Sequence, residues 1–230
     1  MDAGALMEGD ALPARAAAIG LLIPAFLFTA LPALSGINGS SGPIAITSAR
    51  LARSLFLELV LSATLGAWLW RRGWRPFRTA TRPFNWRDLF RGLGLWVALL
   101  VAVVCWAWVC RAVFPTLFGA ASEAQITGRP HPGIVVPFVV YNAVFEELLW
   151  LGLGFAAFER LGTGLAAGIS AGLRLMLHAY QGPLALITIV PVAVIFTLYY
   201  VRTRRLWPII AAHAFQDLLS LGVLAAGGLR

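Results

Sequence analysis

Long apolar stretches alternate with short polar segments along most of this chain. A helix needs about 20 mostly apolar residues to cross the hydrocarbon core of a bilayer, and seven stretches reach or approach that length. They lie near residues 16–34, 51–70, 89–114, 134–158, 163–180, 183–201 and 206–226. The pattern predicts an all-α fold, a polytopic transmembrane helix bundle of about seven spans that forms one membrane domain over residues 1–230.

The composition supports this prediction. Sixty per cent of the 230 residues are hydrophobic and only 12 per cent are charged, which argues against a water-soluble domain. The first ten residues contain Asp2, Glu8 and Asp10 instead of a basic segment, so we expect the first apolar stretch to be a span and not a secretory signal. Cys105 and Cys110, at i and i+5 of the third span, should face different sides of their helix and indicate no redox role.

The basic residues are unevenly distributed. All 18 are arginine, and the formal net charge is +8. Seven of them crowd the connection between the second and third spans: Arg71, Arg72, Arg75, Arg78, Arg82, Arg87 and Arg91. The positive-inside rule places this connection in the cytoplasm, and seven spans then place the N-terminus there and the C-terminus outside. We therefore expect an integral membrane protein, of the bacterial inner membrane by its general character.

Tryptophans flank the arginine-rich connection. Trp68, Trp70, Trp74 and Trp86 lie among the arginines, as expected for a belt at the membrane interface that faces anionic lipid. Binding to nucleic acid is the less favoured interpretation of the same basic cluster. The sequence thus predicts the lipid bilayer as a partner and no nucleic acid, and it leaves the oligomeric state open.

Ionisable residues inside the spans are the main functional evidence, because a charge at the bilayer centre costs several kcal/mol and needs a partner or a purpose. There are seven: Glu58, Glu146, Glu147, Arg174, His178, His213 and Asp217. Glu58 is alone in its span, and a protonated or helix-packing carboxyl group is the favoured interpretation. The other six fall on three helices, and two of their pairs stand at i and i+4 on one helix face.

Each of these pairs also has a structural explanation. Glu147 and Arg174 could form an ion pair that locks two helices, and the two histidines could donate hydrogen bonds within the bundle. Taken together, however, the six side chains form a polar centre larger than helix packing requires. An active site or a translocation site is the better interpretation.

Three motifs carry a resemblance to a known family. They are "EELLWLG" (146–152), "RLMLH" (174–178) and "HAFQD" (213–217), and "RTRRLWP" (202–208) precedes the last of them. Over about residues 134–226 the chain resembles the CAAX prenyl endopeptidase and bacteriocin-processing (CPBP, or Abi) family of glutamic intramembrane proteases. That family has Glu-Glu-x-x-x-Arg, Phe-x-x-x-His and His-x-x-x-Asn or Asp on separate helices. The resemblance implies an intramembrane endopeptidase.

Two positions depart from the family pattern in a complementary way. Leu151 stands where the family has an arginine, and Arg174 stands where it has a phenylalanine. We expect Arg174 to supply from the fifth span the guanidinium that the family supplies from the Glu-Glu helix, and to pair with Glu147. Leu151 would then fill apolar space.

The resemblance also implies catalytic roles. Glu146 would activate a water molecule, and His178 would hold the same water and donate a proton to the leaving amine. Glu147, paired with Arg174, would stay ionised and orient the site. His213 would stabilise the oxyanion, while Asp217 would be protonated or would accept a hydrogen bond from His213. No cofactor and no metal are expected, and the partner is a membrane protein or peptide substrate.

Other functions remain open. The same Glu, His and Asp set could bind zinc, although the sequence has no His-Glu-x-x-His motif. A proton-coupled transporter is less favoured because no internal repeat is found. The absence of arginine at position 151 keeps a catalytically silent scaffold in consideration. Prenylated CAAX tails, bacteriocin leaders and C-terminal sorting helices are the substrate classes that the family suggests, and the first fits this chain least naturally.

Overall fold

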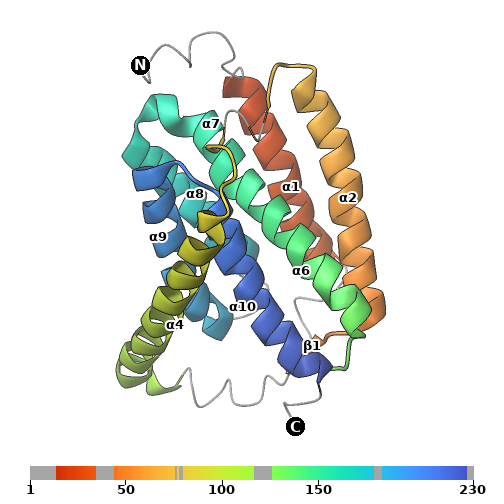
Figure 1. Cartoon of the computed structure of the whole chain (residues 1–230), viewed down its shortest axis with the longest axis vertical. Coiled ribbons are helices and arrows are strands. Elements are labelled where there is room, and N and C mark those ends of the chain that lie inside the picture. Colours follow the sequence, from red (N-terminus) through yellow and green to blue (C-terminus); the bar gives the residue numbers. More distant parts are fainter. Residues whose placement is uncertain are drawn as a thin grey trace.

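The chain folds into a bundle of helices (Figure 1). The computed structural model describes residues 14–34, 44–75, 77, 80–116, 126–178 and 183–226. Its helical segments are α1 (Ala14–Leu34), α2 (Ser48–Trp70), α4 (Arg87–Val113), a continuous segment over residues 132–161, α8 (Thr163–His178), α9 (Pro183–Thr203) and α10 (Trp207–Ala225). These match the seven predicted spans within a few residues, so the all-α prediction is confirmed.

The third span was the longest predicted stretch, and α4 runs through it without a break. The joint between the fifth and sixth spans lies partly outside the described residues, which stop at His178 and resume at Pro183. Apart from the helices, the described chain has one short parallel pairing of β1 (Ile44–Ala45) with β2 (Ile126–Thr127). This pairing joins the segments that precede α2 and the fourth span.

The fourth span changes its helical geometry midway. It begins as α6 (Pro132–Glu147), widens into the π-helical turn η2 (Leu148–Leu153), and continues as α7 (Gly154–Phe158) and the short 3₁₀ turn η3 (Glu159–Leu161). The hydroxyl group of Ser170 on α8 donates a hydrogen bond of 2.5 Å to the carbonyl oxygen of Trp150 within the π-helical turn. Such turns are often found at functional sites, and this one starts directly after the Glu-Glu pair.

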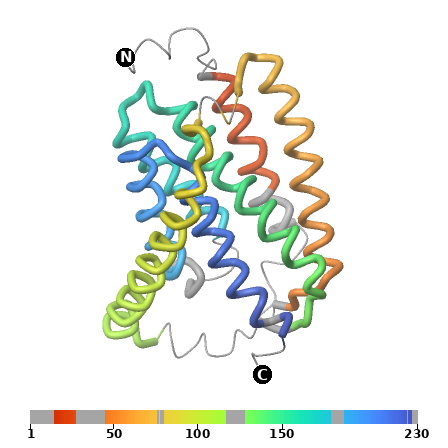
Figure 2. Tube along the Cα trace, viewed as in Figure 1, coloured from red at the N-terminus to blue at the C-terminus, as the bar shows by residue number. Residues whose placement is uncertain are grey.

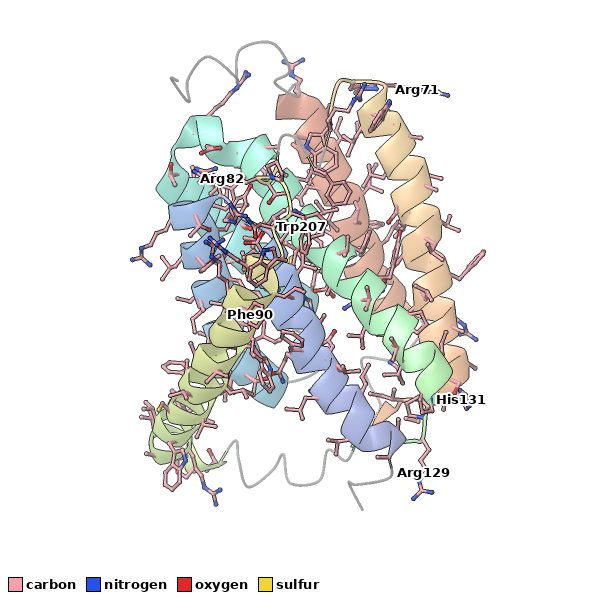
Figure 3. All side chains as sticks on the ribbon, viewed as in Figure 1. Arg71, Arg82, Phe90, Arg129, His131 and Trp207 are labelled. Carbon is pink, nitrogen blue, oxygen red and sulfur yellow. The ribbon has the colours of Figure 1, made fainter. Side chains whose placement is uncertain are left out.

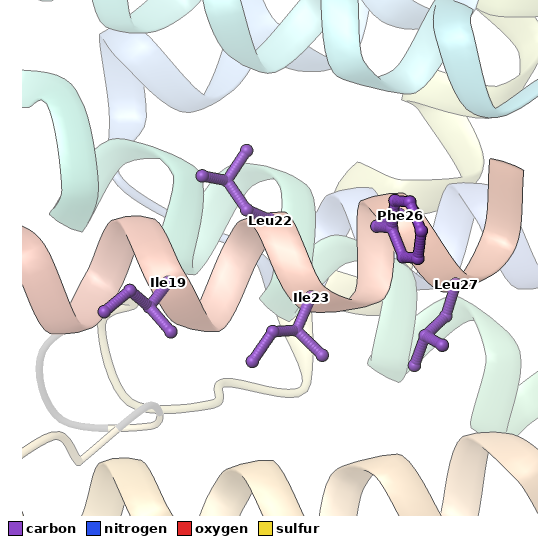
Figure 4. A pocket seen from close by; sticks show the side chains of 5 residues that line it. All are labelled: Ile19, Leu22, Ile23, Phe26 and Leu27. Atoms are coloured by element: carbon purple, nitrogen blue, oxygen red, sulfur yellow. The ribbon is translucent and has the colours of Figure 1, made fainter. Parts of the chain in front are cut away.

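The helices suit a membrane environment. By length and composition, residues 48–70, 87–113 and 132–161 could each cross a bilayer, and residues 15–27 and 187–203 form shorter apolar helices. Figure 4 shows a shallow hollow on the outer side of α1 whose lining is entirely apolar: Ile19, Leu22, Ile23, Phe26 and Leu27. A surface of this kind is suited to lipid. As predicted, Cys105 is exposed and Cys110 is buried, so they lie on different faces of α4.

Helix α10 lies between α4 and α6 and packs most extensively against these two (Figure 2). The contact with α4 depends on Gly92. A methyl group built at Gly92 would lie 2.5 Å from the Cβ atom of Ala211 and 2.8 Å from the carbonyl oxygen of Pro208. The two helix backbones therefore approach each other through a glycine, just before His213 in α10.

Polar contacts fix the turn between α9 and α10. Asp88, fully buried at the start of α4, accepts hydrogen bonds from Arg205 Nε at 3.0 Å and Nη2 at 2.7 Å. The Thr81 hydroxyl accepts a hydrogen bond from the backbone N–H of Leu206, and the Tyr200 hydroxyl donates one to the carbonyl of Ala80. Together these bonds join the start of α10 to the segment that enters α4.

The arginine-rich connection and the α9–α10 turn lie toward the same end of the bundle. Figure 3 shows Arg71 and Arg82 toward one end, and Arg129 and His131 at the other. The predicted orientation requires the arginine-rich connection and the segment before the fourth span to lie on opposite sides of the membrane, and the two lie at opposite ends of the bundle. Which end faces the cytoplasm stays a prediction.

The close contact at Gly92 can be tested with a matched pair of variants. Alanine favours a helix over glycine by about 1 kcal/mol, so Gly94→Ala, where the added methyl group meets nothing within 4 Å, should leave thermal stability in detergent unchanged or raised. Gly92→Ala should lower the melting temperature by several degrees, because α4 and α10 must separate. Equal effects of the two variants would contradict the described packing.

Candidate active site

Six of the predicted residues come from three helices that meet in the middle of the bundle. Glu146 and Glu147 end α6, Arg174 and His178 lie one turn apart on α8, and His213 and Asp217 lie one turn apart on α10. Counted along the sequence, His178 should lie nearer the outer end of its span than Glu146 does. The helices nevertheless bring these two side chains to 4.0 Å, with His178 as the last residue of α8.

Glu147 is the centre of the cluster and is completely buried. Its Oε2 atom lies 2.5 Å from Nη2 of Arg174, and its Oε1 atom lies 2.7 Å from Nδ1 of His213. The predicted pairing of Arg174 with Glu147 is therefore confirmed as a contact. Leu151 is also buried and belongs to the apolar core, as expected for a side chain that fills space.

His213 lies between two carboxylates. Its Nδ1 atom faces Glu147, and its Nε2 atom lies 3.4 Å from Oδ2 of Asp217. The ion-pair contacts of the His213 ring are therefore with Glu147 and Asp217. The same Asp217 oxygen accepts a hydrogen bond of 3.3 Å from Nδ2 of Asn142.

These contacts form a chain of alternating charge that runs Arg174, Glu147, His213 and Asp217. If both carboxylates are ionised, each accepts a hydrogen bond from one ring nitrogen of His213, which must then carry protons on both nitrogens. Two positive groups then balance two negative groups. Burial of separate charges would cost several kcal/mol each, whereas an alternating chain with satisfied hydrogen bonds offsets much of that cost.

Glu146 has a different environment from its neighbour. Its side chain is 20 per cent exposed and that of His178 is 19 per cent exposed, while Arg174 and Glu147 are almost inaccessible. The Oε2 atom of Glu146 is buried, and among the described residues no hydrogen-bond donor contacts it. The two adjacent glutamates therefore differ: Glu147 is buried and ion-paired, whereas Glu146 is more accessible.

Two residues near the cluster were not assigned to it from the sequence. Asn142 stands one turn before Glu146, and its neutral amide is not part of the pattern of ionisable side chains. Glu58 on α2 is 3 per cent exposed and interacts electrostatically with Glu146, Asp217 and His213. Within the described chain its Oε2 atom has no hydrogen-bond partner. Because Glu58 is the one acidic residue within its predicted span, the sequence did not indicate that it lies near the cluster.

Across the residues that the structure describes, no group of three or more His, Cys, Asp or Glu side chains has the geometry to hold a metal ion. The four-residue chain around Glu147 uses its ring nitrogens and carboxylate oxygens for mutual hydrogen bonds and ion pairs.

Comparison with known protein families gives a match over part of the chain. Residues 129–219 match the family described as type II CAAX prenyl endopeptidase Rce1-like. Neither the curated proteins nor the solved structures contain a significant match to the chain. The matched stretch includes all six residues of the cluster, together with Asn142. Over these residues the chain is similar to the CAAX protease family, in agreement with the resemblance carried by its three sequence motifs.

Proposed function

We propose that this chain is an intramembrane endopeptidase that hydrolyses a peptide bond with a water molecule activated by Glu146. The observation that carries this proposal is the contrast between the two adjacent glutamates. Glu147 is occupied by Arg174 and His213, whereas Glu146 faces His178 at 4.0 Å. A water molecule about 2.8 Å from both atoms can bridge that separation with ordinary hydrogen bonds.

The proposed reaction has two stages. In the first, Glu146 removes a proton from the water as its oxygen bonds to the peptide carbon, and the electron pair of the C=O π bond moves onto the carbonyl oxygen. In the second, that pair re-forms the C=O bond while the C–N bond breaks. The leaving nitrogen takes a proton from His178. Glu146 then passes the proton that it took from the water to His178, so both groups regain their initial protonation states. The water molecule thus supplies the OH group of the new carboxylic acid and the hydrogen atom of the new amine.

The remaining residues would keep this pair in place. The ion pair between Arg174 and Glu147 fixes α8 relative to α6, and therefore fixes His178 relative to Glu146. His213 and Asp217 extend the same chain to α10. The charge of Glu147 is paired with Arg174 and His213, so Glu147 serves the site through its position.

The substrate is proposed in general terms as a segment of a membrane protein or a membrane-bound peptide. The family name refers to CAAX prenyl endopeptidases, and this supports a peptide substrate; the proposal does not extend to a prenyl group. For the location we propose a bacterial inner membrane with a cytoplasmic N-terminus, on the strength of the arginine-rich connection. The whole chain would act as one membrane domain.

Replacement of Glu146 tests the proposed mechanism. Glu146→Ala and His178→Ala should each reduce peptide cleavage by at least about 10²-fold, because general acid–base groups typically contribute that much to the transition state. The proteins should still insert and fold. Proteomics of membrane-protein termini, with and without the variant, provides the measurement. Glu159→Gln, a carboxyl change in the same span that only alters the contact with Arg204, is the matched control.

Full activity in Glu146→Ala would contradict this mechanism. Loss of the same cleavages by treatment of the wild type with a chelator would instead indicate the zinc alternative. No cleavage that depends on the wild-type protein would favour a silent scaffold.

The exchange between positions 174 and 151 gives a second test. Arg174→Phe should strongly reduce both stability and activity, because it leaves Glu147 buried with one partner fewer. Leu151→Arg in the same chain restores the arrangement common in the family, so the double variant should recover much of the lost activity. Activity assays and melting temperatures of the two single variants and the double variant measure the coupling. A double variant no better than Arg174→Phe would end the exchange hypothesis.

The proposed orientation can be tested by labelling single cysteines from either side of the membrane, in a background with Cys105 and Cys110 replaced. A cysteine at position 80 should react from the cytoplasmic side, and one at position 230 should react from the opposite side. Seven spans require the two positions to be on opposite sides. Labelling of both from the same side would show that the number of spans is even.

A further inference from the structure

The amide group of Asn142 contacts the candidate site from α6. Its Nδ2 atom donates a hydrogen bond of 3.3 Å to Oδ2 of Asp217. The same oxygen lies 3.4 Å from Nε2 of His213, so one carboxylate oxygen faces two nitrogen donors. Asn142 is 9 per cent exposed, and a buried amide in an apolar span needs a compensating hydrogen bond or a function.

The contacts of His213 on α10 leave neither of its ring nitrogens facing a substrate carbonyl, so a different hydrogen-bond donor is needed there. Both ring nitrogens of His213 face carboxylates, with Glu147 at 2.7 Å from Nδ1 and Asp217 at 3.4 Å from Nε2. An ionised Asp217 accepts hydrogen bonds and cannot donate one. When water attacks a peptide carbonyl, however, negative charge develops on the oxygen, and that charge needs a donor about 3 Å away.

Asn142 has the required donor in a suitable place. An amide nitrogen carries two hydrogens, and the bond to Asp217 uses one of them. Residues 142 and 146 are at i and i+4 on α6, so their Cβ atoms are about 6 Å apart on one helix face. A peptide carbonyl between the two side chains could receive the water from Glu146 and direct its oxygen toward the amide.

We propose that Asn142 is a catalytic residue, and that its second N–H group stabilises the oxyanion formed when the water held by Glu146 attacks the substrate. Asp217 then orients the amide by accepting its other N–H. This role rests on the proposed peptidase function. Asparagine at 142 and aspartate at 217 form a complementary pair, in which the amide comes from α6 and the carboxylate from α10.

The test compares turnover with binding. The probe is an internally quenched peptide that spans a cleavage site lost in cells carrying Glu146→Ala. Asn142→Ala should reduce kcat by about 10²-fold to 10³-fold and change KM by less than about threefold, because the amide acts in the transition state. A phosphonate analogue of the same peptide, which imitates the tetrahedral oxyanion, should lose a comparable factor in affinity, while the uncleaved peptide bound to the inactive Glu146→Ala protein should not.

Two further variants separate this role from helix packing. Asn142→Asp should be as defective as Asn142→Ala, and the exchanged double variant Asn142→Asp with Asp217→Asn should recover at least about tenfold, because it restores one amide and one carboxylate. Gln216→Leu is the matched control. It removes a hydrogen bond of 3.2 Å to Trp96 next to Asp217, but on the side that faces α4, so kcat should be unchanged.

The outcomes are distinguishable. If Asn142 only joins α6 to α10, Asn142→Ala will lower the melting temperature while the folded fraction keeps its kcat and its affinity for the phosphonate, and the proposal is wrong. Cleavage that depends on Glu146 but not on Asn142 overturns this inference alone. If no cleavage depends on Glu146, the proposed function fails and this inference fails with it.

Discussion

The buried ion pair between Arg174 and Glu147 is the constraint on which the rest of the structure depends. A guanidinium and a carboxylate that lie 2.5 Å apart with almost no exposure have lost their hydration, so each is stable only while the other stays in place. Because one partner is on α6 and the other on α8, the pair permits little relative movement of these helices. His213 adds a contact of 2.7 Å from α10, so a single carboxylate determines the positions of three helices.

The packing around this pair is arranged to keep the three helices close. The hydroxyl of Ser170, one turn before Arg174 on α8, bonds to the carbonyl of Trp150 within the π-helical turn. Gly92 lets α4 approach α10 at Ala211, two residues before His213. The hydrogen bonds of Arg205 to Asp88 hold the beginning of α10 at the start of α4. Each of these contacts lies outside the candidate site and still affects where its side chains point.

The sequence predicted the helices well because the bilayer leaves few alternatives. Every backbone polar group in the hydrocarbon core must be satisfied within the chain, so an apolar stretch of sufficient length becomes a helix. The contact between Arg174 and Glu147 was predictable for a similar reason, since an arginine in mid-membrane needs an anion and only a few carboxylates were available.

The details that depend on packing were not predictable. The apolar sequence of residues 148–153 does not indicate a π-helical turn, and its hydrogen bond from Ser170 comes from a different helix. The hydrogen bond from Asn142 joins residues 75 positions apart in the sequence. Because the amide is neutral, Asn142 does not stand out in an apolar span as a charged residue would. Glu58 is near the cluster only because α2 packs against α6. Such long-range contacts follow from the arrangement of the helices and not from their periodicity.

The exchange between positions 151 and 174 can be understood through local charge. In a low-dielectric interior, the energy of a charged group depends on whether an opposite charge is within a few ångströms, and much less on which helix provides it. Arg174 places on α8 the positive charge that an arginine at position 151 would provide on the Glu-Glu segment, and it reaches the same carboxylate. Asp217, at a position where the family has asparagine or aspartate, faces His213 at 3.4 Å, so that a protonated ring would balance an ionised carboxylate there. The chain from Arg174 to Asp217 is then neutral as a whole. Glu146, whose side chain is more exposed than that of Glu147, lies directly beside this cluster.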